Sequence, residues 1–310
     1  MEVVLAYDRV EDKQKNEVFM LTYQSIAEII ELAQSNNQTM SEAVLTDQAS
    51  YMEISKKEIL SRMTESFEVM RQSAIEGLRP GLRSVSGLSG GDGAKMHEYA
   101  SQGLTLGGSF CAEATALAIG IQEYNAAMGK IVAAPTAGSC GILPAGVLTM
   151  MKHRGVSEEA VVKSLITAGA VGMVIANRAT IAGAEGGCQA ECGAAAAMTA
   201  AALVELSGGT VRMVAHSAAI ALQNLLGLVC DPVAGLVEVP CILRNGCGIA
   251  IAINSADLAL AGVKSVIPVD EVVSAMREVG HSMPAALRET SLGGLAATPT
   301  GQAIRERIFG

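Results

Sequence analysis

The sequence predicts a mostly α-helical protein made of one domain, with Gly/Pro-rich loops that converge on a central site. Half of its 310 residues are hydrophobic, yet only 3% are aromatic and none is Trp. The small and aliphatic residues must therefore fill the core, and such side chains let helices pack closely. Strand-like alternation of β-branched and polar residues is rare, which leaves helices as the main element.

Two regions differ in character along the chain. Residues 1–20 have a charged middle and no clear helical period, and we expect them to form an N-terminal extension. Residues 21–310 contain no repeat and no low-complexity linker, so they are predicted to form a single helical domain.

Helix starts are signalled by capping boxes at Ser25–Glu28 and Ser55–Glu58. The second opens an amphipathic pattern that is predicted to stop at Gly77. Residues 77–95 contain Pro80 and many glycines, and they are predicted to form a loop or a series of turns. Further helices are predicted at 109–128, 144–152, 157–176, 188–206, 212–229, 246–262 and 269–279.

Charge and cysteine usage limit the partners and the compartment. The net charge is −9 and no Lys/Arg cluster occurs, which argues against nucleic acid or an anionic membrane as partner. No basic segment followed by an apolar stretch opens the chain, so secretion is not expected. Seven cysteines are an odd number and several lie in apolar surroundings, which favours a reducing cytoplasm over a disulfide framework.

A membrane span was considered for residues 131–151, which carry no charge. Pro135 and Pro144 interrupt this stretch, with Gly138 and Gly141 between them. Interrupted, Ala-rich segments of this kind are more typical of buried helices in a large protein, so no membrane insertion is predicted.

The glycine-rich sequence SGLSGGDGAK ends at Lys95. It is not a phosphate-binding P-loop, because Ala94 and Met96 flank the lysine where Gly and Ser/Thr are required. What remains is a turn with free backbone amides at Gly91 and charged side chains at Asp92 and Lys95, which suits an anionic group. An ordinary surface turn explains the same residues.

The sequence PTAGSCG, residues 135–141, places Thr136, Ser139 and Cys140 in an apolar-flanked turn. The hydrolase pattern G-x-S-x-G fails here by one position. The two hydroxyl groups could bind a substrate carboxylate, although a satisfied buried turn is the alternative.

The cysteines of GCQAECG and of a later Pro-containing segment are candidate metal ligands. Cysteine beside proline in irregular backbone is typical of iron–sulfur ligation, and the absence of C-x-x-C argues against zinc ribbons and thioredoxin-like chemistry. Spacing leaves buried inert thiols as an equally valid interpretation. The candidates are Cys188, Cys192, Cys230, Cys241 and Cys247.

Histidines are few, and His97 and His216 lie next to the candidate loops. Either could be a base or an orienting donor, although an ordinary structural histidine is the simpler interpretation of a lone His.

Four long motifs carry a family resemblance: APTAGSCGILPAGVL, GAEGGCQAECGAAAAMTAAALVELSGG, HSAAIALQNLLGLVCDPVAGLVEVPCILRN and SLGGLAATPTG. They resemble the alpha chain of iron–sulfur-dependent L-serine dehydratase (L-serine ammonia-lyase), from about residue 22 to the C-terminus. The resemblance implies a lyase of amino-acid degradation that converts L-serine to pyruvate and ammonia, with residues 21–310 as its catalytic domain.

The resemblance also implies a [4Fe–4S] cluster held by Cys188, Cys230 and Cys241, with Cys192 as a packed thiol. Three protein ligands leave one iron open, and an open iron can act as a Lewis acid. The glycine-loop amides with Gly91, Asp92 and Lys95, and the hydroxyls of Thr136 and Ser139, are then the predicted carboxylate binders. For proton transfer we favour His216 and then Lys95.

Relatives of this kind carry an extra N-terminal domain or a separate beta chain, so a beta chain and an oligomer are the expected partners. The C-terminal sequence RERIFG lacks the cysteine found in the tail of single-chain relatives. Two alternatives are a pyridoxal-phosphate amino-acid dehydratase, which would need a Schiff-base lysine in a strand-rich chain, and a non-enzymatic helical membrane or scaffold protein.

Overall fold

A computed structural model describes residues 23–310 of the chain; the extension predicted at residues 1–20 lies outside the described residues. Over residues 23–310 the secondary structure consists of helices, short 3₁₀ segments and one isolated β-bridge, with no β-strand. The predicted fold class, one mostly helical domain, is confirmed.

Thirteen α-helices make up this part of the chain. They are α1 (Ile26–Ser35), α2 (Met40–Tyr51), α3 (Lys56–Gly77), α4 (Asp92–Ser101), α5 (Gly108–Ala126), α6 (Ile142–Arg154), α7 (Glu158–Arg178), α8 (Gly183–Gly186), α9 (Ala194–Leu206), α10 (Val211–Gln223), α11 (Cys241–Leu260), α12 (Val269–Ser282) and α13 (Pro299–Phe309).

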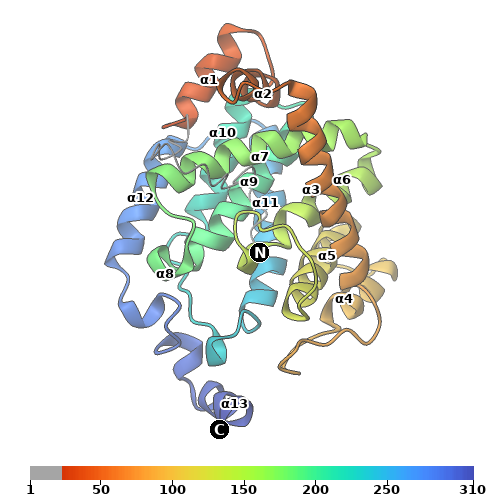
Figure 1. Cartoon of the computed structure of the whole chain (residues 1–310), viewed down its shortest axis with the longest axis vertical. Helices are drawn as coiled ribbons and strands as arrows, with labels where there is room; N and C mark the ends of the chain where they lie inside the picture. The colour runs from red at the N-terminus through yellow and green to blue at the C-terminus, as the bar shows by residue number, and fades with distance from the viewer. Residues whose placement is uncertain (1–22) are drawn as a thin grey trace.

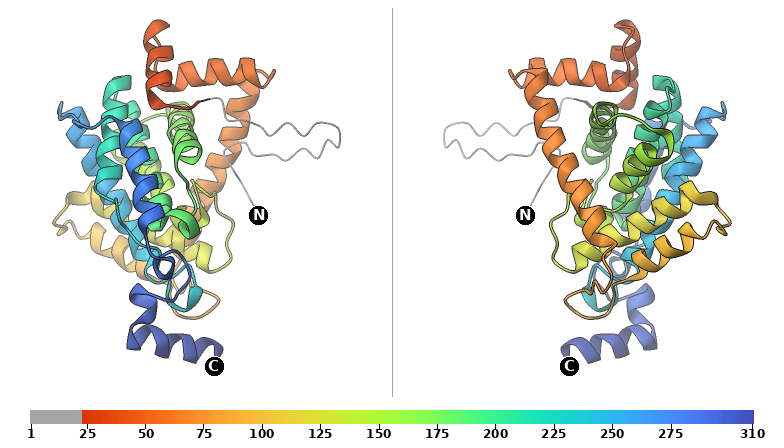
Figure 2. Two further views of the ribbon diagram at one scale, coloured as in Figure 1. Left: turned by 90° about the vertical axis from the view of Figure 1, so that its left-hand side faces the viewer. Right: turned by 90° about the vertical axis from the view of Figure 1, so that its right-hand side faces the viewer.

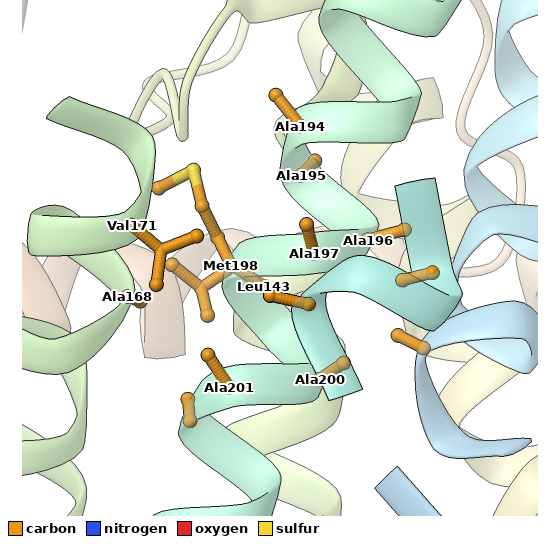
Figure 3. Packing of buried hydrophobic residues seen from close by; sticks show 14 of the residues in the cluster. Leu143, Ala168, Val171, Ala194, Ala195, Ala196, Ala197, Met198, Ala200 and Ala201 are labelled. Atoms are coloured by element: carbon orange, nitrogen blue, oxygen red, sulfur yellow. The ribbon is translucent and has the colours of Figure 1, made fainter. Parts of the chain in front are cut away.

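Helix α9 is the centre of the molecule (Figure 1), in contact with α6, α7, α10 and α11. Every residue from 194 to 204 is buried, and most of them are alanines. Its central Met198 lies among Leu143 of α6 and Ala168 and Val171 of α7 (Figure 3). A helix that is apolar all round must be covered all round, and the other helices supply that cover.

Glycines on the covering helices allow the close approach to α9. A Cβ atom on Gly146 of α6 would lie 2.6 Å from the Thr199 Cγ2 atom. A Cβ atom on Gly172 of α7 would lie 2.8 Å from the Met198 Sδ atom. Real Cβ atoms are not found this close to other heavy atoms, so these two positions fix the spacing of α6 and α7 from α9.

Three helices extend the body at its two ends. Helices α1 and α2 lie at one end, and α13 lies at the opposite end beyond the rest of the helices (Figures 1 and 2). The predicted capping box of α1 is present, because the Ser25 hydroxyl accepts from the Glu28 amide and the Glu28 carboxylate accepts from the Ser25 amide. Helix α3 begins after Ser55 and ends at Gly77 as predicted.

Several predicted boundaries are wrong. Helix α4 begins at Asp92, inside the predicted loop, because a carboxylate distant in sequence caps its first turn (described below). Helix α10 ends at Gln223, six positions before the predicted end at 229, and α11 begins at Cys241, five before its predicted start at 246. The predicted helix at 188–206 begins with a π-helical turn, Gln189–Gly193, that leads into α9.

Among the described residues one helix, α7, is long and apolar enough to cross a membrane, and 67% of its most apolar window is buried inside the protein. Residues 131–151, considered above, divide into an irregular segment and α6. Burial of α7 against α9, α2 and α3 accounts for its apolar composition.

Substitution of Gly146 by Ala should lower the free energy of unfolding by about 1–3 kcal/mol, because the new methyl group overlaps Thr199 and overpacks the α6–α9 contact. Denaturant unfolding monitored by circular dichroism measures this change.

Gly193→Ala is the matched control, because Gly193 has helical dihedral angles and its added Cβ would meet its nearest neighbour at an ordinary 3.6 Å. The control should be neutral or slightly stabilising. Equal effects of the two substitutions would contradict the packing argument.

Candidate functional site

Three separate segments each contribute one of the predicted ligand cysteines. Cys188 lies just before the π-helical turn, Cys230 lies in the loop after α10, and Cys241 is the first residue of α11. All three side chains are buried, with exposed fractions of 2%, 3% and 6%. The charges of Cys188 and Cys241 act on Cys230, and that of Cys188 acts on Cys241, so the three thiols share one neighbourhood.

The surroundings of Cys230 and Cys241 oppose ionisation of these thiols to thiolates. Burial is the main cause that raises the pKa of Cys230, and it raises the pKa of Cys241 to about 12. The Cys192 Sγ atom lies 3.4 Å from the Cys188 Sγ atom, and this thiol neighbour lowers the pKa of Cys188. Cys192 is also buried, as the packed-thiol interpretation expects.

A partly buried guanidinium supplies positive charge beside these thiols. Arg244 of α11 donates to the Val229 carbonyl at 2.7 Å and to the Asp231 Oδ1 atom at 2.8 Å. The same guanidinium acts on Cys188 and Cys241, and the Coulombic attraction favours their thiolate forms. The site therefore contains a fixed partner for anionic sulfur.

The Cys230 loop is held on its other side by the segment after α12. The Cys230 amide donates to the Leu287 carbonyl at 2.9 Å, and the Glu289 amide donates to the Cys230 carbonyl at 2.7 Å. The Asp231 Oδ2 atom accepts from the Leu295 amide at 2.7 Å. These bonds fix the backbone of one predicted ligand from two directions.

The π-helical turn is anchored by Gln189. Its side-chain amide donates to the Met276 carbonyl of α12 and accepts from the Gly227 amide, each at 2.9 Å. Gly187 before the turn has φ +75°, and a Cβ atom there would lie 2.6 Å from the Met283 Sδ atom, so glycine is required. Single π-helical turns inside α-helices are frequent at functional sites.

Glu191, on the same turn, joins the cysteines to the predicted carboxylate-binding turn. Its Oε1 atom accepts from the Thr136 hydroxyl at 2.8 Å, and the Thr136 and Ser139 hydroxyls lie 3.1 Å apart. Its Oε2 atom lies 3.8 Å from the Cys230 Sγ atom. The structure thus brings Thr136 and Ser139 beside the cysteines.

Sequence reasoning missed Glu191. Burial, its largest influence, raises the pKa of this carboxyl group. The available signal was an acid placed between two cysteines in a stretch otherwise made of small residues, where an unpaired carboxylate would be costly.

The glycine-rich loop is tied to the cysteine segment by another buried acid. The hydroxyls of Ser86 and Ser89 both donate to the carboxylate of Glu238, which lies between Cys230 and Cys241 in sequence and is 5% exposed. On the outer side of this contact, a cavity of about 710 Å³ is lined by Val85, Ser86, Val237, Glu238 and Phe309.

The end of the same loop has a structural partner. The amides of Asp92 and Gly93 donate to the fully buried carboxylate of Glu123, at 2.8 and 3.0 Å. The Lys95 ammonium pairs with Asp92 at 2.7 Å and has a 77% exposed side chain. The amides of Asp92 and Gly93 thus already hold an anion of the protein itself, and the substrate roles of Gly91, Asp92 and Lys95 stay predictions.

His216 lies on α10, in a different electrostatic neighbourhood. Partial burial, together with the positive charges of Lys264 and Arg212, lowers its pKa. Lys264 follows the C-terminal end of α11, whereas Cys241 is at the N-terminal end of that helix, about 30 Å away by helical rise. The structure therefore does not bring His216 together with the cysteines, and its catalytic role stays a prediction.

The fold and this site define an all-helical protein with a buried cysteine centre beside paired hydroxyls and a carboxylate. The sequence profile of the family "Serine dehydratase alpha chain" matches residues 24–296. The chain belongs to the serine dehydratase alpha chain family.

Relatives extend over nearly the whole chain. The probable L-serine dehydratase, alpha chain, of Bacillus subtilis (strain 168) is 46% identical over 288 residues, which are 93% of this chain and 96% of the relative. The L-serine dehydratase, alpha chain, of Peptoniphilus asaccharolyticus is 47% identical over 278 residues, 90% and 95% of the two chains. A longer L-serine dehydratase of Mycobacterium tuberculosis is 38% identical over 295 residues, 61% of its own length.

Replacement of Arg244 by Leu should lower the free energy of unfolding of the metal-free chain by about 3–5 kcal/mol, because it leaves the Asp231 carboxylate buried without its partner. Urea unfolding measures the change. Arg62→Leu, which removes an ion pair whose side chains are 51% and 46% exposed, is the control and should cost below about 1 kcal/mol. Similar losses of unfolding free energy in both variants would contradict a structural role for the Arg244–Asp231 ion pair.

Proposed function

We propose that this chain is the alpha chain of an L-serine dehydratase, which converts L-serine to pyruvate and ammonia. Membership in the family supports the reaction. The observation that carries the proposal is the convergence of Cys188, Cys230 and Cys241 beside the Thr136–Glu191 contact. This arrangement supports one site in which the cysteines would serve as ligands and the hydroxyls would bind the substrate.

The cysteines suit a [4Fe–4S] cluster as the cofactor. Over residues 23–310 no three His, Cys, Asp or Glu side chains are grouped closely enough to hold a single metal ion. A cluster binds each cysteine through a different iron and accepts a wider spacing. The partly buried Arg244 guanidinium also suits an anionic group, so we assign Cys188, Cys230 and Cys241 as the ligands of the cluster.

With three cysteine ligands, such a cluster supplies a Lewis-acidic iron for a hydroxyl leaving group. The chain's own residues then bind and orient L-serine. The Ser139 hydroxyl donates a hydrogen bond to the substrate carboxylate, and Thr136, whose single hydroxyl proton goes to Glu191, lines the same part of the site. Burial of Ser139 keeps water from this contact and strengthens it.

Loss of the α-proton and of hydroxide converts serine to aminoacrylate and water. Tautomerisation and hydrolysis of the imine then give pyruvate and ammonia. His216 and then Lys95 are the proposed proton-handling groups within the chain, with Gly91 and Asp92 as additional carboxylate contacts. Because His216 and the cysteines occupy different neighbourhoods, a group from a separate beta chain is the second candidate for the base.

The alpha-chain relatives support a separate beta chain as partner, and an oligomeric enzyme follows from that proposal. The seven unpaired cysteines support a cytoplasmic location, where thiols stay reduced. A pyridoxal-phosphate dehydratase is not favoured, since residues 23–310 form helices where that alternative expects strands. A membrane or scaffold role is not favoured either, since the apolar helix α7 is mostly buried in the protein.

Alanine at Cys188, Cys230 or Cys241 should each abolish stable iron binding and serine turnover after anaerobic reconstitution, because each removes one ligand. Iron and sulfide analysis with the visible absorbance of the protein measures the loss. Cys192→Ala and Cys247→Ala are the controls and should keep the iron. Retention of iron by all three ligand variants would refute the cluster assignment.

Ser139→Ala should raise the KM for L-serine by about tenfold or more with iron content unchanged, because it removes a hydrogen bond to a charged group. Ser164→Ala, which deletes another buried hydroxyl bonded to a helix carbonyl, is the control and should leave KM unchanged.

Lys95→Ala and His216→Gln, measured in parallel, test the proposed roles of those residues: normal kcat and KM would remove them from the mechanism.

A further inference from the structure

The proposed substrate is a zwitterion whose ammonium group has no partner in the site as assigned so far. Ser139 accounts for its carboxylate, and the cluster accounts for its hydroxyl. An ammonium group buried without an acceptor is costly, and a carboxylate oxygen is its strongest partner among side chains. The partner of this ammonium group must therefore be an acid near the site with unused accepting capacity.

Four acids surround the site, and in three of them, all buried, each carboxylate oxygen already accepts a hydrogen bond from the protein. The Glu123 carboxylate accepts hydrogen bonds from two backbone amides, and the Glu238 carboxylate accepts them from two serine hydroxyls. Asp231 receives the Arg244 guanidinium on one oxygen and the Leu295 amide on the other. These carboxylates hold segments of the chain together.

Glu191 differs from them. Its Oε1 atom accepts from Thr136, whereas the contact recorded for its Oε2 atom is the Cys230 thiol at 3.8 Å, a weak donor at long range. Once that sulfur is a metal ligand it has no proton to donate. The Oε2 atom is then the acceptor among these acids that is left for a ligand.

The surroundings of Glu191 leave room for its carboxylate. A Cβ atom on Gly138 would lie 2.9 Å from the Oε1 atom, and one on Gly183 would lie 2.6 Å from the Oε2 atom. Both glycines thus keep side chains away from the carboxylate. It lies between the Thr136–Ser139 hydroxyls and the Cys230 sulfur, the two places where the substrate carboxylate and the cluster belong.

We propose that the Glu191 Oε2 atom binds the α-ammonium group of the substrate and so makes the site selective for 2-amino acids over 2-hydroxy acids. This specificity role rests on the proposed function. The carboxylate and ammonium of an amino acid are attached to one carbon, which matches a donor hydroxyl on Ser139 and an acceptor carboxylate on Glu191, both in contact with Thr136. A site built around such an acceptor rejects an analogue that lacks the donor.

The test compares L-serine with L-glycerate, in which a hydroxyl replaces the ammonium group. Glu191→Gln keeps an oxygen for the Thr136 hydroxyl and removes the negative charge. In the cluster-loaded enzyme with its beta chain, this variant should bind L-serine about tenfold to a hundredfold more weakly. Its affinity for L-glycerate should stay the same, so the serine-to-glycerate preference falls by that factor.

The readouts are the KM for L-serine, the inhibition constant of L-glycerate against serine turnover, and the iron content. Glu289→Gln is the matched control, because the exposed Glu289 acts on Glu191 and Cys230 through its charge alone. It should keep the wild-type preference. An unchanged preference in Glu191→Gln would overturn the proposal.

If Glu191→Gln fails to load iron, Glu191→Asp provides the second measurement, because it keeps the charge but withdraws it by one methylene group. It should also lose preference for serine, and a wild-type ratio in that loaded variant would overturn the proposal equally. Failure of the wild-type enzyme to turn over serine would instead refute the proposed function.

Discussion

The structure depends on one packing constraint, the complete burial of helix α9. A helix with an apolar surface on every side needs neighbours on every side, and its alanines let α6, α7, α10 and α11 approach closely. The turn that leads into this helix is therefore enclosed as well. Cys188 lies just before that turn and is buried by the same packing as the alanines, whereas Glu191 on the turn stays partly exposed.

Buried charge is the second determinant of the site. Each carboxylate in it is placed where a hydroxyl, an amide or a guanidinium meets it, and these contacts join segments that are far apart in sequence. Glu238 fixes the glycine-rich loop and Asp231 fixes the segment after α12. The acids that order these loops are therefore paired, whereas the charge of Glu191 opposes the thiolate forms of Cys188, Cys230 and Cys241.

Sequence patterns predicted the parts of this molecule that follow from local physics. The capping box at Ser25 and the amphipathic helix that ends at Gly77 were predicted because their signals lie within a few residues. The start of α4 was not, since its cap is Glu123 from another helix. The family resemblance singled out Cys188, Cys230 and Cys241 among the candidate cysteines. His216 was chosen as a base because it lies near the candidate loops in sequence, but in the fold its charged neighbours are Lys264 and Arg212.

The strap that holds Cys230 comes from residues 287–295, far along the chain from the cysteine itself. During synthesis the loop around Cys230 leaves the ribosome well before its strap exists. The hydrogen bonds that hold the Cys230 loop can therefore form only after translation has passed residue 295. Completion of the cysteine site is thus a late event in folding. A premature stop upstream of the strap would yield a polypeptide that has all its sulfur donors but an unfinished pocket.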